Sequence, residues 1–194
     1  GLGNVAKDNG DYCRVVNSGH YQRISRLLSD AQDQGGTLIT GGQTDDASRF
    51  IAPTLIEGMA ADSAIMHEEI FGPLLPVITF SDIDEVVTYV NSKPKPLALY
   101  IYSTDKSSID KILSETSAGD TCVNQTMMHF LHHNLPFGGV NNSGIGKSGG
   151  VWGFNAFTHE RSVLTDKFSS ASMLHPPYTP KVRKIIKMAM KMTT

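Results

Sequence analysis

Apolar residues recur along the chain in short segments that alternate between an extended and a helical period. Strands are predicted at 74–80, 97–102 and 121–124, because each is a nearly continuous apolar run bounded by turn residues. The two stretches between them have apolar residues at helical spacing, beginning near Ser81 and near Asp105. Strand, helix, strand, helix, strand is typical of a parallel sheet with helical connections. We therefore predict an α/β fold with a mostly parallel sheet and flanking helices.

The amino-terminal part predicts a helix followed by short strands. The helix covers about 20–34, with Asn17 or Ser18 as its cap, and its apolar stripe has helical spacing. Members of the stripe are Ile24, Leu27, Leu28 and Ala31. Strands are predicted at 37–40 and 50–56.

Two of the predicted strands contain a proline, which lacks the N–H group that a central strand needs. Pro53 therefore favours an edge position for 50–56. Pro76 likewise favours an edge or bulged position for 74–80, although the apolar content of that strand indicates that it is largely buried.

The carboxy-terminal part is harder to assign. Residues 154–158 and 161–165 are expected to be extended. In the tail, 169–194, three prolines precede a basic segment whose apolar residues alternate too loosely with cations to predict an amphipathic helix. Two alternatives remain open for the tail: a docked or partly mobile segment, and a helix on a membrane surface.

Composition narrows the classes of protein. The 194 residues are enough for one domain with a sizeable core, and the formal net charge of -2 argues against electrostatic binding to nucleic acid. The two cysteines have a spacing that fits neither a zinc site nor a disulfide framework, which favours a reducing, cytoplasmic setting. No apolar run approaches the roughly 20 residues of a membrane span.

The run EEIFGP at 68–73 is the first candidate for chemistry. It places two carboxylates beside an aromatic ring, followed by a Gly-Pro turn that leads into a strand. A carboxylate held just before a strand can accept two hydrogen bonds, for instance from the vicinal hydroxyls of a ribose. The alternative is a solvated pair of glutamates before a turn.

This run resembles a highly specific signature of the aldehyde dehydrogenase family, and the later motifs agree with the family to about Lys167. The resemblance implies that Glu69 contacts the nicotinamide ribose of NAD or NADP and that Phe71 packs beside the nicotinamide. It also implies that 1–168 is the carboxy-terminal portion of a three-layer catalytic domain. Within the family, the chain resembles the coniferyl-aldehyde dehydrogenase branch.

A glycine-rich run, GIGKSG at 144–149, matches two phosphate-binding patterns. Both patterns need a strand before the glycines and a helix after them, and we expect neither here. Asn141 also stands where a P-loop has glycine. The run instead resembles the loop that follows Pro-Phe-Gly-Gly in aldehyde dehydrogenases, which implies that Phe137 lines the substrate tunnel.

Three histidines, His129, His132 and His133, raise the possibility of a metal site. No Cys, Asp or Glu stands at a matching spacing, so we predict no metal. His129 is a candidate for the substrate channel, and Asn124 for the floor of the site.

The family's reaction proceeds through a cysteine in a Gly-Gln-x-Cys context, and neither Cys13 nor Cys122 has that context. We therefore predict no catalytic residue in this chain and expect it to be inactive alone. The resemblance implies a parent enzyme that oxidises an aldehyde to a carboxylic acid, with a symmetric dimer as the default assembly. The alternative is a non-catalytic module that acts as an assembly partner.

Overall fold

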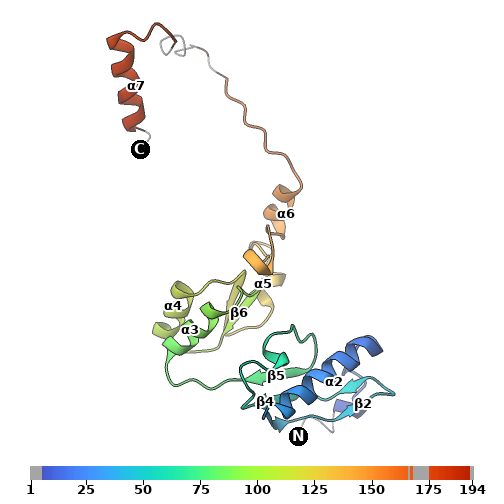
Figure 1. Ribbon diagram of the computed structural model, residues 1–194. Coiled ribbons are helices and arrows are strands. Elements are labelled where there is room, and N and C mark those ends of the chain that lie inside the picture. Colours follow the sequence, from blue (N-terminus) through green and yellow to red (C-terminus); the bar gives the residue numbers. More distant parts are fainter. Residues whose placement is uncertain (1–5, 166, 168–174, 193–194) are drawn as a thin grey trace. The chain divides into compact units, whose positions relative to one another are not determined.

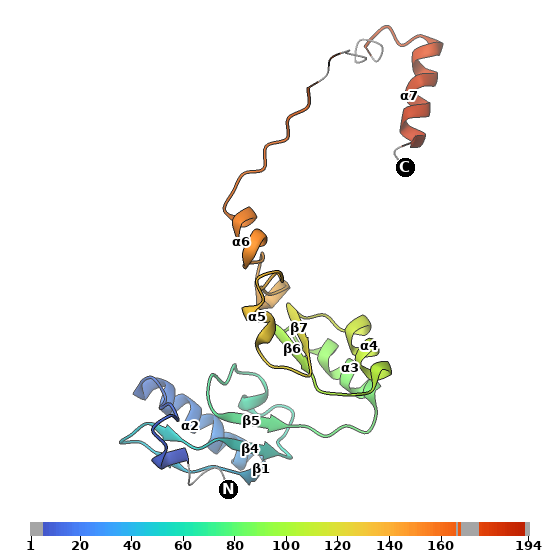
Figure 2. The ribbon, with the colours of Figure 1, turned by 180° about the vertical axis from the view of Figure 1, so that it is seen from behind.

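The computed structural model describes residues 6–165, 167 and 175–192 (Figure 1; Figure 2). It divides the chain into two compact units, Gly1–Ser92 and Lys93–Thr194, and each is described by itself. Helices and strands are interspersed in both units, and the predicted α/β class is confirmed.

Helix α2, Ser18–Asp33, begins and ends where local signals place its boundaries. The side chain of Asn17 accepts a hydrogen bond from the His20 N–H at 2.9 Å, which satisfies one of the free donors of the first turn. After the helix, Gly35 has a φ of +92° and the Gly36 N–H donates to the Ala31 carbonyl at 2.8 Å. Glycine allows this left-handed turn without steric cost.

The first unit contains a three-stranded mixed sheet in the order β1-β4-β5, formed by Thr37–Thr40, Thr54–Glu57 and Leu74–Val77. Strand β4 pairs with β1 in antiparallel and with β5 in parallel orientation. A separate two-stranded ladder joins β2, Thr44–Asp45, to β3, Phe50–Ile51. The predicted strand 50–56 is therefore divided at Ala52 and Pro53, and the predicted edge position is wrong for β4, which is the central strand.

Helix α2 packs against this sheet and supplies most of the core (Figure 1). Its predicted apolar stripe is buried, with Ile24, Leu27 and Ala31 fully inaccessible to solvent. From the sheet side, Ile56 of β4 and Leu74 of β5 complete the cluster. Burial of each such aliphatic side chain contributes roughly 1.5–3 kcal/mol to stability.

Strand β5 differs from its prediction. It lies at the edge of the described sheet, as Pro76 indicates, but only Leu74 is buried. Leu75, Ile78 and Phe80 are exposed by 58%, 51% and 60%, so the predicted burial of the strand is wrong for the described residues. Helix α3, Ile83–Ser92, follows, and the carboxylate of Asp82, not the side chain of Ser81, accepts the hydrogen bond of its first turn.

The second unit opens with β6, Ala98–Ile101, then α4, Lys106–Glu115, then β7, Asp120–Val123. The two strands pair in parallel with Ala98 opposite Asp120, as the strand-helix-strand pattern predicts. Strand β5 pairs with β4, and β6 pairs with β7, in two separate sheets of the described residues. Periodicity predicts strands but does not specify which edges pair.

Four further helical segments follow: α5, Met128–Leu131; η2, Asn141–Ser143; α6, Gly150–Ala156; and α7, Pro180–Met192. The extended conformation predicted for 154–158 is wrong, because Phe154 to Ala156 belong to α6. Residues 161–165 have no regular secondary structure. In the tail, where a helix on a membrane surface was one of the two alternatives left open, α7 is a regular helix of 13 residues.

The cap of α2 generates a stability prediction. Asn17→Ala should lower the free energy of unfolding by about 1 kcal/mol, because the His20 N–H loses its acceptor. Urea unfolding followed by circular dichroism measures this change. Asn17→Ser keeps a side-chain acceptor and should restore most of the loss, whereas equal midpoints for the Ala and Ser variants would contradict the capping role.

The cap of α4 generates a prediction on pH. Hydrogen bonds from the Ser108 hydroxyl and N–H lower the pKa of Asp105 below its usual value. A depressed folded-state pKa stabilises the protein above the unfolded pKa, about 3.9, and this contribution is lost as pH falls through the folded value. We expect Asp105→Asn to reduce the difference between urea midpoints at pH 6 and pH 3. Asp110→Asn, in the same helix, is the charge-matched control, and an equal reduction in both variants would contradict the capping role of Asp105.

Candidate functional site

The turn that carries Glu69 and Phe71 is held in place by Arg23 of α2. The Arg23 guanidinium donates from Nη1 to the Glu69 carbonyl at 3.0 Å and from Nη2 to the Ile70 carbonyl at 2.6 Å. A planar guanidinium that binds two successive carbonyls fixes both the position and the orientation of the backbone. The turn before β5 is therefore positioned by the helix that forms the core.

The two adjacent glutamates have different roles. Glu68 is 3.2 Å from Arg26 Nη2 and 3.7 Å from Arg23 Nη1, so its carboxylate is paired with both cations. Within the described part of the chain, the carboxylate of Glu69 has no hydrogen bond or ion pair, and the residue is exposed. The carboxylate that the sequence singled out is thus the one left available to a ligand.

Phe71 occupies an uncommon backbone conformation. Its φ of +43° lies in the left-handed region, which an aromatic residue rarely adopts, and its side chain is 80% exposed. Next to it, a Cβ on Gly72 would lie 2.6 Å from Cδ1 of the buried Ile24, so the turn lies directly on α2. Strained residues of this kind concentrate at sites of function, and this observation supports the choice of Phe71.

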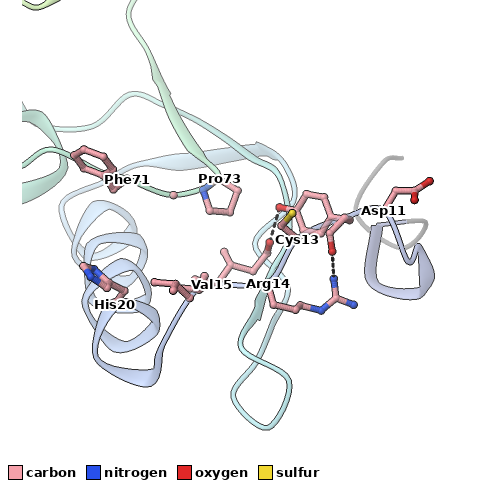
Figure 3. A pocket seen from close by; sticks show the side chains of 11 residues that line it. Asp11, Cys13, Arg14, Val15, His20, Phe71 and Pro73 are labelled. Atoms are coloured by element: carbon pink, nitrogen blue, oxygen red, sulfur yellow. Dashed lines mark hydrogen bonds between the residues drawn. The ribbon is translucent and has the colours of Figure 1, made fainter.

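A hollow of about 680 Å³ lies beside Phe71 in the first unit (Figure 3). In Figure 3, Phe71 and Pro73 lie along one side, and Val15 and His20 lie across from them. The residues that line it are Asp11, Tyr12, Cys13, Arg14, Val15, Val16, His20, Ile51, Phe71, Gly72 and Pro73. Glu69 is not among them, so the described structure does not place both predicted cofactor residues in one hollow.

The wall opposite the turn is rigidly constructed. The Tyr12 hydroxyl donates to the Ile51 carbonyl at 2.9 Å, and burial raises the pKa of Tyr12 above its ordinary value. The Arg14 guanidinium lies 5.0 Å from the centre of the Phe50 ring and donates to the Tyr12 carbonyl at 2.8 Å. A cation over an aromatic face is attracted by the ring quadrupole, so Arg14 contributes a fixed positive charge to this wall.

In the second unit, two of the predicted tunnel residues lie together. The rings of His129 and Phe137 have their centres 5.8 Å apart, and Tyr100 lies 5.8 Å from His129. Phe130 meets Phe137 edge-on at 5.1 Å. His129 is only 8% exposed, and neither of its buried ring nitrogens has a hydrogen-bond partner in the described residues. A buried polar atom without a partner is costly, and such atoms are typical of functional positions.

Asn124 has a different environment from these rings. Its side chain accepts from the Ser103 N–H and donates to the Ser103 carbonyl, both at 2.9 Å. This reciprocal pair joins the end of β7 to the loop after β6. The described contacts of Asn124 are therefore structural, and its place on the floor of a substrate site stays a prediction.

The Pro-Phe-Gly-Gly loop is anchored by a nearly buried carboxylate. Asp120, whose side chain is 10% exposed, accepts from the Gly138 N–H at 3.1 Å and lies 3.9 Å from Lys147 Nζ. The Lys147 ammonium also donates to the carbonyls of Gly119, at 2.8 Å, and Gly138. Reciprocal backbone hydrogen bonds between Phe137 and Ser148 close the loop. Together these contacts fix the position of Phe137.

The same contacts bear on the P-loop pattern. The expectation that no helix follows the glycines is wrong, because α6 begins directly after them, at Gly150. However, the segment before the glycines has no strand, and the ammonium of Lys147 binds two carbonyls of the chain itself. A P-loop lysine instead extends to the phosphates of a nucleotide.

The remaining candidates have no catalytic arrangement within the described residues. No group of three or more His, Cys, Asp or Glu is placed to hold a metal ion there. His132 Nδ1 accepts a hydrogen bond from the Asn134 N–H at 3.2 Å, and its neighbour His133 is exposed. Cys122 is half-buried in β7, and Cys13 is exposed at the wall of the hollow.

Sequence reasoning missed the residues that position the site. Arg23, Asp120 and Lys147 contact residues that lie 9 to 47 positions away in the sequence, and no local spacing indicates such contacts. Arg23 and Arg26 do lie three residues apart on a helix, which places them on one face, and this was the available signal.

Comparison with known proteins gives a consistent result. Residues 2–163 match the aldehyde dehydrogenase family. The 4,4'-diaponeurosporen-aldehyde dehydrogenase of Staphylococcus aureus is 41% identical over 184 residues, which is 94% of this chain and 39% of that protein. The dimeric NADP-preferring aldehyde dehydrogenase of Canis lupus familiaris is 38% identical, covering 94% of this chain and 39% of that protein.

Among solved structures, the substrate-bound state of Staphylococcus aureus AldH superposes with a TM-score of 0.82 at 40% identity. The match covers 94% of this chain and 39% of that structure, so the chain spans about two fifths of the length of these relatives. Since the family match covers most of the sequence and includes EEIFGP, the chain belongs to the aldehyde dehydrogenase family.

Proposed function

We propose that this chain is the carboxy-terminal portion of an enzyme that oxidises an aldehyde to a carboxylic acid with NAD or NADP. The observation that carries the proposal is the turn at 68–71, where the Glu69 carboxylate has no hydrogen bond or ion pair among the described residues and Phe71 has an exposed ring. The family relationship supports a cofactor-binding role for this turn. We take 1–168 as the catalytic portion. We assign no reacting group within it, since neither cysteine has the Gly-Gln-x-Cys context.

Glu69 would bind the nicotinamide ribose of the cofactor. A carboxylate accepts two hydrogen bonds at once, which suits vicinal hydroxyls, and these charged hydrogen bonds are stronger than neutral ones. Glu68 cannot substitute for it without breaking its pairs with Arg23 and Arg26. Phe71 would pack beside the nicotinamide, which, when bound, accepts the hydride from the substrate.

The aldehyde would lie against the rings of His129 and Phe137 in the second unit. Phe137 offers an apolar wall, and His129 offers ring nitrogens that lack a partner in the described residues. Asn124 would lie at the floor. Such a lining suits an apolar or aromatic aldehyde, and coniferyl aldehyde is the candidate that the sequence resemblance favours.

For assembly and setting, we propose a homodimer in the cytoplasm. The canine relative is named dimeric and NADP-preferring, and two copies related by symmetry are the commonest arrangement for an oligomer. Whether the cofactor is NAD or NADP depends on contacts with the adenosine ribose, for which this chain offers no assigned residue.

The role of Glu69 is testable in the complete protein. Glu69→Gln should lower kcat/KM for the cofactor by roughly 10- to 100-fold, because a neutral amide replaces a charged acceptor. Glu68→Gln is the matched control, since it removes the adjacent carboxylate but leaves the Glu69 carboxylate in place. Aldehyde-dependent reduction of NAD or NADP is the measurement.

Equal loss in the two variants would contradict the assignment to Glu69. The 194-residue chain should be inactive in the same assay. Activity in the chain alone would mean that Cys13 or Cys122 is the nucleophile and that the proposed division of residues is wrong.

His129 gives a separate prediction. His129→Leu removes two buried polar atoms that lack partners, so the urea midpoint of the chain should be unchanged or higher. In the complete protein, the KM for the aldehyde should rise if the ring nitrogens contact the substrate. His132→Leu is the control at an exposed neighbour. A marked loss of stability in His129→Leu with unchanged KM would contradict a role in the tunnel.

A further inference from the structure

Helix α7 has a regular amphipathic pattern that the alternation of its residues obscures. Its apolar side chains at i, i+3, i+4 and i+7 form one stripe, made of Val182, Ile185, Ile186 and Ala189. The opposite face has cations at i, i+3 and i+7, which are Lys184, Lys187 and Lys191. At 100° per residue, Lys181 and Arg183 lie at the two borders between these faces.

The start of α7 is encoded locally. Thr179 precedes Pro180, the combination that favours a cap followed by the first helical position. The Thr179 carbonyl accepts from the Arg183 N–H at 3.0 Å, and the Arg183 side chain donates from Nε to the Tyr178 carbonyl at 3.1 Å. The register of the two faces is therefore set at this end, independently of tertiary packing.

The apolar stripe of α7 is not part of a core. No residue of α7 is buried in the described structure: Val182, Ile185 and Ile186 of the stripe are half-buried, and Ala189 is exposed. The family match ends at residue 163, so α7 lies beyond the part of the chain that the family model covers.

The charge of α7 favours an anionic surface as the partner of the apolar stripe. The segment 180–192 contains five cations and no carboxylate, whereas the whole chain has a net charge of -2. An anionic surface would therefore attract this segment selectively. The border cations can extend their long stems along the apolar face while their charged ends reach the anions, as Lys and Arg do at lipid interfaces.

The length of α7 decides its orientation. Thirteen residues extend about 20 Å, which is less than the roughly 30 Å of a bilayer core. No helix in the described residues is long and apolar enough to cross a membrane. We propose that α7 lies in the plane of an anionic lipid bilayer, with its apolar stripe in the headgroup boundary and its lysines toward the lipid phosphates.

Vesicle binding by the full chain tests the charge requirement. Vesicles of phosphatidylcholine with one third phosphatidylserine should bind the chain, vesicles of phosphatidylcholine alone should bind it weakly, and high salt should release it. Removing two cations with Lys184→Gln and Lys187→Gln should weaken binding roughly 30-fold. Lys95→Gln with Lys106→Gln removes the same charge from exposed positions outside α7 and should leave binding unchanged.

The orientation is tested by fluorescence. In a Trp152→Phe background, which removes the single tryptophan, Ile186→Trp should shift its emission to the blue on anionic vesicles. Lys187→Trp, one residue away on the cationic face, should shift little.

Three outcomes would overturn the proposal. Equal binding to neutral and anionic vesicles would remove the electrostatic basis, and equal blue shifts at 186 and 187 would contradict the in-plane orientation. The third outcome is that the chain does not bind vesicles and that Ile186→Ser changes its sedimentation from that of a dimer to that of a monomer. This result would show that a second copy of the protein covers the stripe.

Discussion

Burial of one face of α2 against the sheet is the contact on which the first unit and its site depend. Ile24 is fully buried, and it lies so close to Gly72 that a Cβ there would collide with its side chain. This close approach places Arg23, one residue earlier on the helix, within hydrogen-bond distance of the Glu69 and Ile70 carbonyls. The hydrophobic core therefore determines where the turn lies, and the guanidinium determines how it is oriented.

This arrangement separates the functions of two identical side chains. Arg23 and Arg26 neutralise Glu68, and the backbone of Glu69 is fixed while its carboxylate is left without a partner among the described residues. A charged group that is preorganised in this way needs little rearrangement to bind a ligand. The positive φ of Phe71 is consistent with the same constraint, since the turn must place an aromatic ring outside the core.

In the second unit, Asp120 positions the Pro-Phe-Gly-Gly loop, as Arg23 positions the turn in the first unit. A carboxylate that is almost buried requires compensation, and it obtains it from the Gly138 N–H and the Lys147 ammonium. The glycines of this loop are needed because backbones approach closely: a Cβ on Gly139 would lie 2.1 Å from the Ser143 carbonyl oxygen. The glycine-rich pattern that resembles a phosphate site is therefore explained by backbone packing and an internal lysine.

Features encoded by neighbouring residues could be predicted from the sequence, and features that depend on distant contacts could not. Asn17 and Asp105 cap their helices as expected, and 37–40 is a strand with the predicted bounds. The central place of β4 and the pairing of β5 with β4 depend on which edges pair, and a strand's own sequence does not specify this. For the candidate site, Glu69 and Phe71 stay predictions, and no local pattern in the sequence indicated Arg23, which holds their turn.

Helices α6 and α7 show where the apolar pattern predicts secondary structure poorly. Helix α6 contains Gly150 and Gly153, which disfavour a helix, and none of its residues is buried. In α7 no apolar residue is buried either, and the cations between the apolar residues obscure their helical spacing. A short isolated helix is marginal in water, so the order of α7 rests on its cap, its first-turn proline and whatever covers its apolar stripe. A surface that both covers the stripe and neutralises the lysines would stabilise the helix most.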